Sequence, residues 1–209
     1  MRSNIIPQEK QHLVWRHIAD MVLERQESTV TQQAIADELE VSKALVHHAL
    51  IPLRGSGAVE VVGKRLVVRD VKKVLLHWAV HRRLDRDIVL ALGGEDTPDA
   101  TVRSCPPGLS FTSFAGYVRR YAEHPAPYAI VRAYIDPNAE ALRKELVERF
   151  PRPRGPGDPG LVLHAADPAL ARAKPAIVSA AQLYVDLWNE ADFFAMDYLR
   201  ALDRRLNLA

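Results

Sequence analysis

The chain has 209 residues, 48% hydrophobic and 26% charged, a balance typical of a soluble globular protein with one large or two small domains. No apolar run approaches the length of a membrane span and the N-terminal residues lack the apolar core of a signal peptide, so we expect no membrane partner. A single cysteine, Cys105, excludes an internal disulfide framework and predicts a cytoplasmic location.

The net charge of +2 is unevenly distributed along the chain. Residues 1–41 carry four Lys/Arg against seven Asp/Glu, a net −3, and residues 93–209 carry fourteen against fifteen, a net −1. Residues 42–92 carry ten against four, a net +6. A localised basic segment of this kind suits a phosphate backbone, although a solvated basic face would show the same charge.

Residues 7–25 predict an amphipathic helix, because Val14, Ile18, Met21 and Val22 recur at helical spacing. We expect Trp15 to pack in the core or at a domain or subunit contact.

Two short helices joined by a tight turn are predicted next, with Thr31 and Ser42 as their N-caps. Glu40 stands at the turn position where glycine is usual, which predicts a strained left-handed backbone there. The second helix ends near residues 52–55. The predicted buried stripes of the two helices are Ala34, Ile35, Ala36 and Leu39, then Ala44, Leu45, Ala49 and Leu50.

Two β-rich runs, residues 58–62 and 66–68, follow these helices and are joined through Gly63 and Lys64. Gly63 can take the positive φ that a tight hairpin needs. Asp70 is then placed to cap a connector helix over residues 71–84, between an N-terminal domain of residues 1–70 and a C-terminal domain of residues 85–209.

The helix-turn-helix and the following hairpin resemble a winged helix-turn-helix DNA-binding domain, through Ala36, Val41, Ser42, Val46 and Leu50. This resemblance implies that residues 42–50 enter the major groove and that the hairpin tip meets the minor groove or its phosphates. The partner is then double-stranded DNA, bound by a homodimer or by paired monomers on an inverted repeat. The candidate DNA-binding residues are Gln32, Gln33, Ser42, Lys43, Val46, His47, His48, Lys64, Arg65, Arg69, Lys72 and Lys73.

The second half predicts an α/β domain with a small sheet, so that the whole chain is of mixed α/β class. Strands are expected at residues 88–92, 128–135 and 161–164, with helices at 110–121 and 138–150. The helix between the last two strands favours their parallel pairing. A long helical region is predicted over residues 179–206.

Residues 177–188, IVSAAQLYVDLW, carry the pattern V-S-x-x-Q-L-Y-x-D-L. With the winged helix upstream, this pattern resembles the AbiEi antitoxin family of transcriptional regulators. The resemblance implies an autoregulatory antitoxin of the kind that counteracts its toxin without forming a complex with it. From the residues alone we expect structural roles, with Ser179 as an N-cap, Leu183 and Leu187 facing inward, and Asp186 accepting hydrogen bonds from the amides of a nearby loop.

Catalytic chemistry finds little support in the sequence, so we expect no enzyme, no cofactor and no metal. Cys105 has no adjacent His or second Cys, and His77 and His81 stand one helical turn apart without a third ligand nearby. Asp136 and Asp167 follow predicted strands, but each precedes a proline, which is a routine turn signal. The alternatives to a DNA-binding regulator are an adaptor that binds protein through its winged domain and an enzyme built on the C-terminal half.

Overall fold

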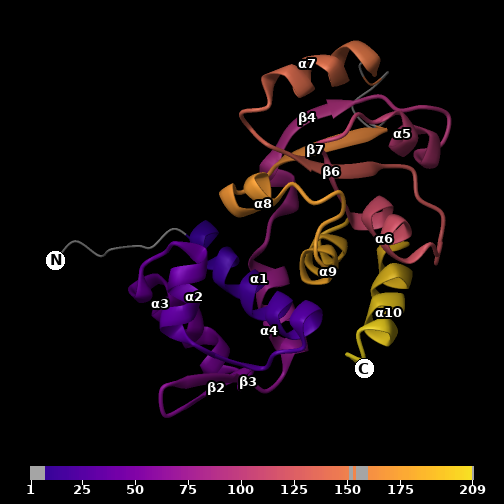
Figure 1. Cartoon of the computed structure of the whole chain (residues 1–209). Coiled ribbons are helices and arrows are strands. Elements are labelled where there is room, and N and C mark those ends of the chain that lie inside the picture. Colours follow the sequence, from indigo (N-terminus) through magenta and orange to yellow (C-terminus); the bar gives the residue numbers. More distant parts are fainter. Residues whose placement is uncertain (1–7, 151–152, 154–159, 209) are drawn as a thin grey trace. The chain divides into compact units, whose positions relative to one another are not determined.

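Helix α1, Gln8–Arg25, opens the computed structural model, which describes residues 8–150, 153 and 160–208 (Figure 1). Residue 7, where the predicted helix began, lies outside the described residues. Val14, Ile18 and Met21 are buried as predicted, whereas Val22 is half-buried. Trp15 is a core residue, 1% exposed, and its Nε1 donates to the Ala49 carbonyl oxygen at 2.8 Å.

Strand β1, Thr29–Thr31, leads into α2, Gln32–Leu39, and α3, Lys43–Gly55. Both predicted N-caps are confirmed: Thr31 Oγ1 accepts from the Ala34 amide at 3.1 Å, and Ser42 Oγ accepts from the Leu45 amide at 3.2 Å. Glu40 adopts the predicted left-handed conformation, with φ of 54°. In this strained conformation the Glu40 amide donates to the carbonyl oxygens of Ala36 and Asp37 and so caps the end of α2.

Strands β2, Val59–Val62, and β3, Arg65–Val68, form the predicted hairpin. Val62 pairs with Arg65, so the loop has two residues, and Gly63 has the positive φ of 63° that the first central position of a type II′ turn requires. The antiparallel order β1-β3-β2, together with α1, α2 and α3, is the arrangement of a winged helix-turn-helix.

Helix α4, Val71–His81, begins at the predicted cap, where Asp70 Oδ1 accepts from the Lys73 amide at 3.0 Å. The described residues divide into two compact units, which are 8–82 with 179–181 and 206–208, and 83–178 with 182–205. This division counts α4 with the first unit, whereas the sequence suggested a separate connector.

The second unit contains the predicted small sheet, in the order β4-β7-β6-β5. Its strands are β4 Ile88–Leu92, β5 Ser110–Thr112, β6 Val131–Ile135 and β7 Leu161–Ala165. Strands β6 and β7 pair in parallel through the crossover helix α7, Glu140–Arg149, as predicted, and the other two pairings are antiparallel. The mixed α/β class is therefore confirmed.

The two faces of this sheet carry different kinds of side chain, apolar on one and largely polar on the other, because successive strand residues point to opposite sides. Val131, Ala133 and Ile135 join an apolar cluster with Leu146 of α7. Arg132 and Tyr134, between them, contact α9 and the residues that follow it. Helices α7 and α9 (Ala180–Trp188) lie on opposite sides of the sheet (Figure 1).

Two expectations for this half need correction, and one helix was not predicted. Residues 110–112 are strand β5 rather than the start of a helix, since they pair with β6, and α6 spans only Ser113–Tyr121. The segment 95–108 contains a further helix, α5 (Pro98–Ser104), capped by Thr97. The long C-terminal helical region is broken after Trp188, and a second helix, α10, covers Ala195–Arg205. The structure also has a 3-10 turn at Leu84–Asp87 and the short helix α8 at Pro168–Ala173.

Candidate nucleic-acid interface

Helix α3 separates its side chains into a buried and an exposed face. Leu45, Val46, Ala49, Leu50 and Leu53 are at most 4% exposed and anchor the helix in the first unit. The opposite face is open to solvent and presents Lys43, Ala44, His47, His48, Ile51 and Arg54. The helix is therefore held rigidly by its core while a polar and basic surface remains free to meet a partner.

Two residues of α3 depart from the sequence prediction. Val46 was a candidate contact, but its side chain is 0% exposed, so it is a core residue that cannot reach a DNA groove. Ala44 was placed in the buried stripe but is exposed. Both departures follow from the position of the buried face of α3. That face is centred near Ala49 and Leu53, so it includes Val46 and excludes Ala44.

The hairpin tip carries Lys64 and Arg65, both exposed. Arg69, also a predicted contact, instead pairs with Glu60 across the hairpin, with Nη2 at 2.7 Å and Nε at 2.8 Å from Oε2. Its charge is therefore partly used within the protein, whereas the tip residues make no side-chain hydrogen bond or ion pair in the part of the chain that the structure describes.

The remaining predicted contacts flank α3 at the starts of α2 and α4. Gln32 is half-buried, and the exposed Gln33 donates from Nε2 to Asp37 Oδ1 at 2.8 Å. Lys72 is half-buried and has a partner of its own, and the exposed Lys73 lies with Nζ 3.7 Å from Asp70 Oδ2. These residues are less free to bind phosphate than those of α3 and the hairpin tip.

The sequence prediction missed two exposed residues in the second half of α3, Ile51 and Arg54. Ile51 is 50% exposed, and both residues line an open hollow of about 480 Å³ between α3 and strand β2. Gly55, Val59, Glu60 and Val61 complete the hollow. The signal was present in the sequence, since residues four and seven positions after His47 share its helical face.

Four cations thus stand on α3 and the hairpin tip without an internal ion-pair partner among the described residues: Lys43, Arg54, Lys64 and Arg65. Cations left unpaired on an exposed helix face and on the following hairpin can neutralise phosphates and release the counterions bound to them. The exposed imidazoles of His47 and His48 add hydrogen-bonding groups to the same face.

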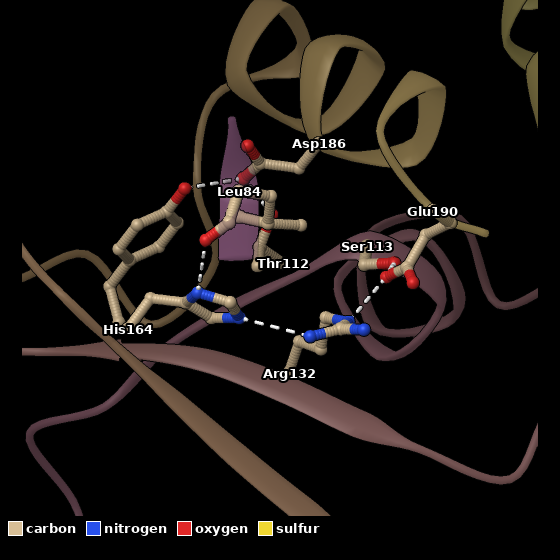
Figure 2. Close-up of polar contacts among 8 residues, drawn as sticks. Leu84, Thr112, Ser113, Arg132, His164, Asp186 and Glu190 are labelled. Atoms are coloured by element: carbon tan, nitrogen blue, oxygen red, sulfur yellow. Dashed lines mark hydrogen bonds and ion pairs between the residues drawn. The ribbon is translucent and has the colours of Figure 1, made fainter. Parts of the chain in front are cut away.

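A second cluster of polar residues is buried in the other unit and centres on Asp186, which is 0% exposed (Figure 2). Asp186 Oδ2 accepts from Thr112 Oγ1 at 2.6 Å and from the Tyr134 hydroxyl at 2.8 Å, and Oδ1 accepts from Gln182 Nε2 at 2.9 Å. The donors are thus side chains, where the sequence suggested loop amides. Gln182 and Asp186 lie one helical turn apart and bond to each other, so this cluster explains their spacing in the sequence.

An ion pair lies beside this hub (Figure 2). Arg132 Nε is 2.7 Å from Glu190 Oε1, which also accepts from Ser113 Oγ. Burial raises the pKa of Glu190 against the opposing effect of Arg132. Arg132 donates to His164 Nε2 at 3.4 Å, and because His164 Nδ1 faces the Leu84 carbonyl oxygen at 3.1 Å, that imidazole carries its proton on Nδ1.

These contacts join strands β5, β6 and β7 to α9 and the segment after it, and Asp186 and His164 are 0% exposed. Leu183 and Leu187 are buried as predicted. Ser179 bonds to the carboxylate of Asp20, and the Ala180 amide donates to Glu24 Oε1 at 2.8 Å, both within the first unit.

Residues considered for chemistry are arranged for other roles. Cys105 is half-buried, and burial raises its thiol pKa to about 12, which disfavours the reactive thiolate. The rings of His77 and His81 contact each other at a tilt of 42°, with centroids 4.4 Å apart, and His81 Nδ1 lies 2.8 Å from the His77 carbonyl oxygen. Asp167 caps α8, with Oδ1 accepting from the amides of Ala169 and Leu170.

The described residues contain no group of three or more His, Cys, Asp or Glu side chains placed to hold a metal ion. Within the same residues, no helix combines the length and the apolar character needed to cross a membrane.

Comparison with protein-family models, with curated proteins and with solved structures found no match to this chain.

Proposed function

We propose that this protein is a sequence-specific regulator of transcription that binds double-stranded DNA through α3 and the β2–β3 hairpin. The observation that carries the proposal is the set of unpaired cations on the exposed face of α3 and on the hairpin tip. A winged helix-turn-helix places these two elements at the groove and at the adjacent phosphates.

In this proposal the exposed face of α3 lies in the major groove, with its N-terminal half nearest the bases. Lys43 and His47, one turn apart and both exposed, face base edges or phosphates. Lys64 and Arg65 lie along the flanking minor groove, and Arg54 contacts the strand that passes between α3 and β2. Glu60 also borders that hollow, but its pairing with Arg69 offsets its repulsion of phosphate.

The resemblance of residues 177–188 to the AbiEi motif supports a narrower proposal, an autoregulatory antitoxin that works in the cytoplasm without binding its toxin. The buried hydrogen bonds of Gln182 and Asp186 give that motif a structural role, so the antitoxin assignment rests on the sequence resemblance alone. A neighbouring gene for a nucleotidyltransferase-like toxin, and rescue of toxin-arrested growth by this protein, test it. Failure of the rescue would remove the antitoxin assignment and leave DNA binding intact.

Selection of bound duplexes from a random library tests DNA binding directly. We expect enrichment of one sequence, and an inverted repeat would indicate two protomers on the site. The double variant Lys64→Ala/Arg65→Ala should weaken binding to all sequences and flatten the slope of log affinity against log salt by about 2.

The double variant Arg103→Ala/Arg204→Ala is the matched control. It removes the same charge from exposed positions on α5 and α10 in the second unit, and its salt slope should equal that of the wild type. No enrichment at low salt would refute the proposal, and an unchanged slope in the hairpin variant would remove the wing from it.

A further inference from the structure

The exposed face of α3 is apolar along its middle. At 100° per residue, Ala44 and Ile51 project within about 20° of each other at the centre of the solvent face. Lys43, His47 and Arg54 stand on one side of this line, and His48 stands on the other. A single exposed aliphatic residue is ordinary, but a centred apolar line between cationic and imidazole side chains is a pattern that needs an explanation.

Internal packing does not provide that explanation. The core contacts of α3 are made by the opposite face, from Leu45 to Leu53, while Ile51 remains 50% exposed and Ala44 is exposed. The hollow beside Ile51 is open and leaves one flank of its side chain uncovered. Ile51 is thus held rigidly on a helix and presented to whatever the helix meets.

Double-stranded DNA offers a matching apolar group in the major groove, the C5-methyl of thymine. Charged side chains at the edges of a recognition surface contact phosphates, whereas the centre faces base edges. Ala44 and Ile51 are seven residues apart, about 10 Å along a helix. Since bases on one strand are about 3.4 Å apart, this separation matches about three base-pair steps.

We propose that Ala44 and Ile51 are specificity-determining residues that read the methyl groups of two thymines, about three base pairs apart, in the major groove. This inference rests on the proposed DNA binding and names the base pairs that the helix prefers. Lys43, His47 and Arg54 then supply polar and phosphate contacts around the two apolar ones.

The test replaces each thymine of the selected duplex, one at a time, by deoxyuridine, which lacks only the methyl group. At two positions we expect wild-type affinity to fall about fourfold, the effect of withdrawing one buried carbon from an apolar contact. In Ile51→Ala one of these two effects should disappear, and in Ala44→Ser the other. Val80→Ala, which shortens a side chain that is 64% exposed on α4, should retain both.

The outcomes separate this inference from the proposed function. If deoxyuridine leaves wild-type affinity unchanged at every position, methyl readout is refuted while DNA binding stands. If the thymine effects persist undiminished in Ile51→Ala and Ala44→Ser, other residues read the methyl groups and the assignment fails. If no duplex is bound at low salt, the proposed function itself fails.

Discussion

Replacing Asp186 by Ala should destabilise the second unit more than most single substitutions. The carboxylate is fully buried and accepts hydrogen bonds from Thr112, Tyr134 and Gln182. An alanine leaves all three donors facing an empty space. Tyr134 also accepts from Gln182 Nε2 at 3.1 Å, so the loss affects a connected group rather than three separate bonds.

The expected cost follows from the kind of bond lost. A hydrogen bond to a charged group contributes about 1.5–3 kcal/mol, so three such bonds set an upper range. Removing the carboxylate also relieves the penalty for burying its charge, which offsets part of the loss. We therefore expect Asp186→Ala to lower the free energy of unfolding by about 3–5 kcal/mol. Asp186→Asn keeps the shape and should cost about 1–3 kcal/mol.

Urea unfolding followed by far-UV circular dichroism measures this change, and hydrogen exchange of peptides from β5 and β6 locates it. The matched control is Asp96→Asn, an exposed carboxylate without a side-chain hydrogen bond or ion pair in the described part of the chain, which should change stability by less than about 0.5 kcal/mol. The double variant Asp186→Asn/Tyr134→Phe should be less destabilised than the sum of its single variants, because both remove the same bond.

A loss below about 1 kcal/mol in Asp186→Ala would refute the reasoning, since it would mean that the three donors find other acceptors at little cost. Additive effects of the Asn and Phe substitutions would equally show that Asp186 and Tyr134 do not act together.

Four other substitutions test the packing of the two units. Burial raises the pKa of Asp20 from 3.8 to about 6, so the charged carboxylate lowers the stability of the protein as pH rises through 6. Asp20→Asn should therefore stabilise the protein by roughly 2–3 kcal/mol at pH 7.5 and by little at pH 4. Burial lowers the pKa of His12 and of His77 from 6.5 to about 4, so each histidine makes the protein less stable as pH falls from 6.5 to 4. His12→Gln or His77→Gln should reduce this loss of unfolding free energy, measured by urea titration at each pH. Gly116→Ala would place its Cβ 2.9 Å from the Phe111 carbonyl oxygen and should cost about 1–3 kcal/mol by thermal or urea unfolding.

Each of these has an outcome that would contradict it. For Asp20→Asn, the contradicting result is a gain in unfolding free energy that is the same at pH 4 and pH 7.5. For the histidine variants, it is a loss of stability on acidification equal to that of the wild type. Gly55→Ala controls for Gly116→Ala, because a Cβ at Gly55 meets no atom within 4 Å. A loss at Gly116 no larger than that at Gly55 would contradict the steric argument.

Local signals allowed accurate prediction from the sequence. The caps at Thr31, Ser42 and Asp70 each depend on a side chain that bonds an amide three residues later, so the information lies within one helical turn. Gly63 likewise indicates the hairpin turn, because glycine readily adopts the positive φ that this turn requires. The winged arrangement followed from these signals and from the apolar spacing between them.

Contacts between distant residues could not be predicted in the same way. Two of the three donors to Asp186 lie 74 and 52 residues earlier in the chain, at Thr112 and Tyr134, and no local sequence pattern identifies either one. Residues 110–112 form a strand because β6 pairs with them, although their sequence runs directly into a helix. In the candidate interface, spacing identified the exposed Lys43 and His47, but the exact buried arc that excludes Val46 and exposes Ile51 depends on how α3 packs.

The completion of the first unit by residues 179–181 has a consequence for folding during synthesis. Asp20 and Glu24 of α1 bond to Ser179 and to the Ala180 amide, so these acceptors remain without those partners until residue 180 has been made. At about 5–20 residues per second, the ribosome needs roughly 5–20 s to travel from the end of α4 to that point. During this interval α1, which packs against the helix α3 that we propose to bind DNA, exists without these contacts. The nascent chain should therefore acquire its final stability only as the last part of the second unit emerges.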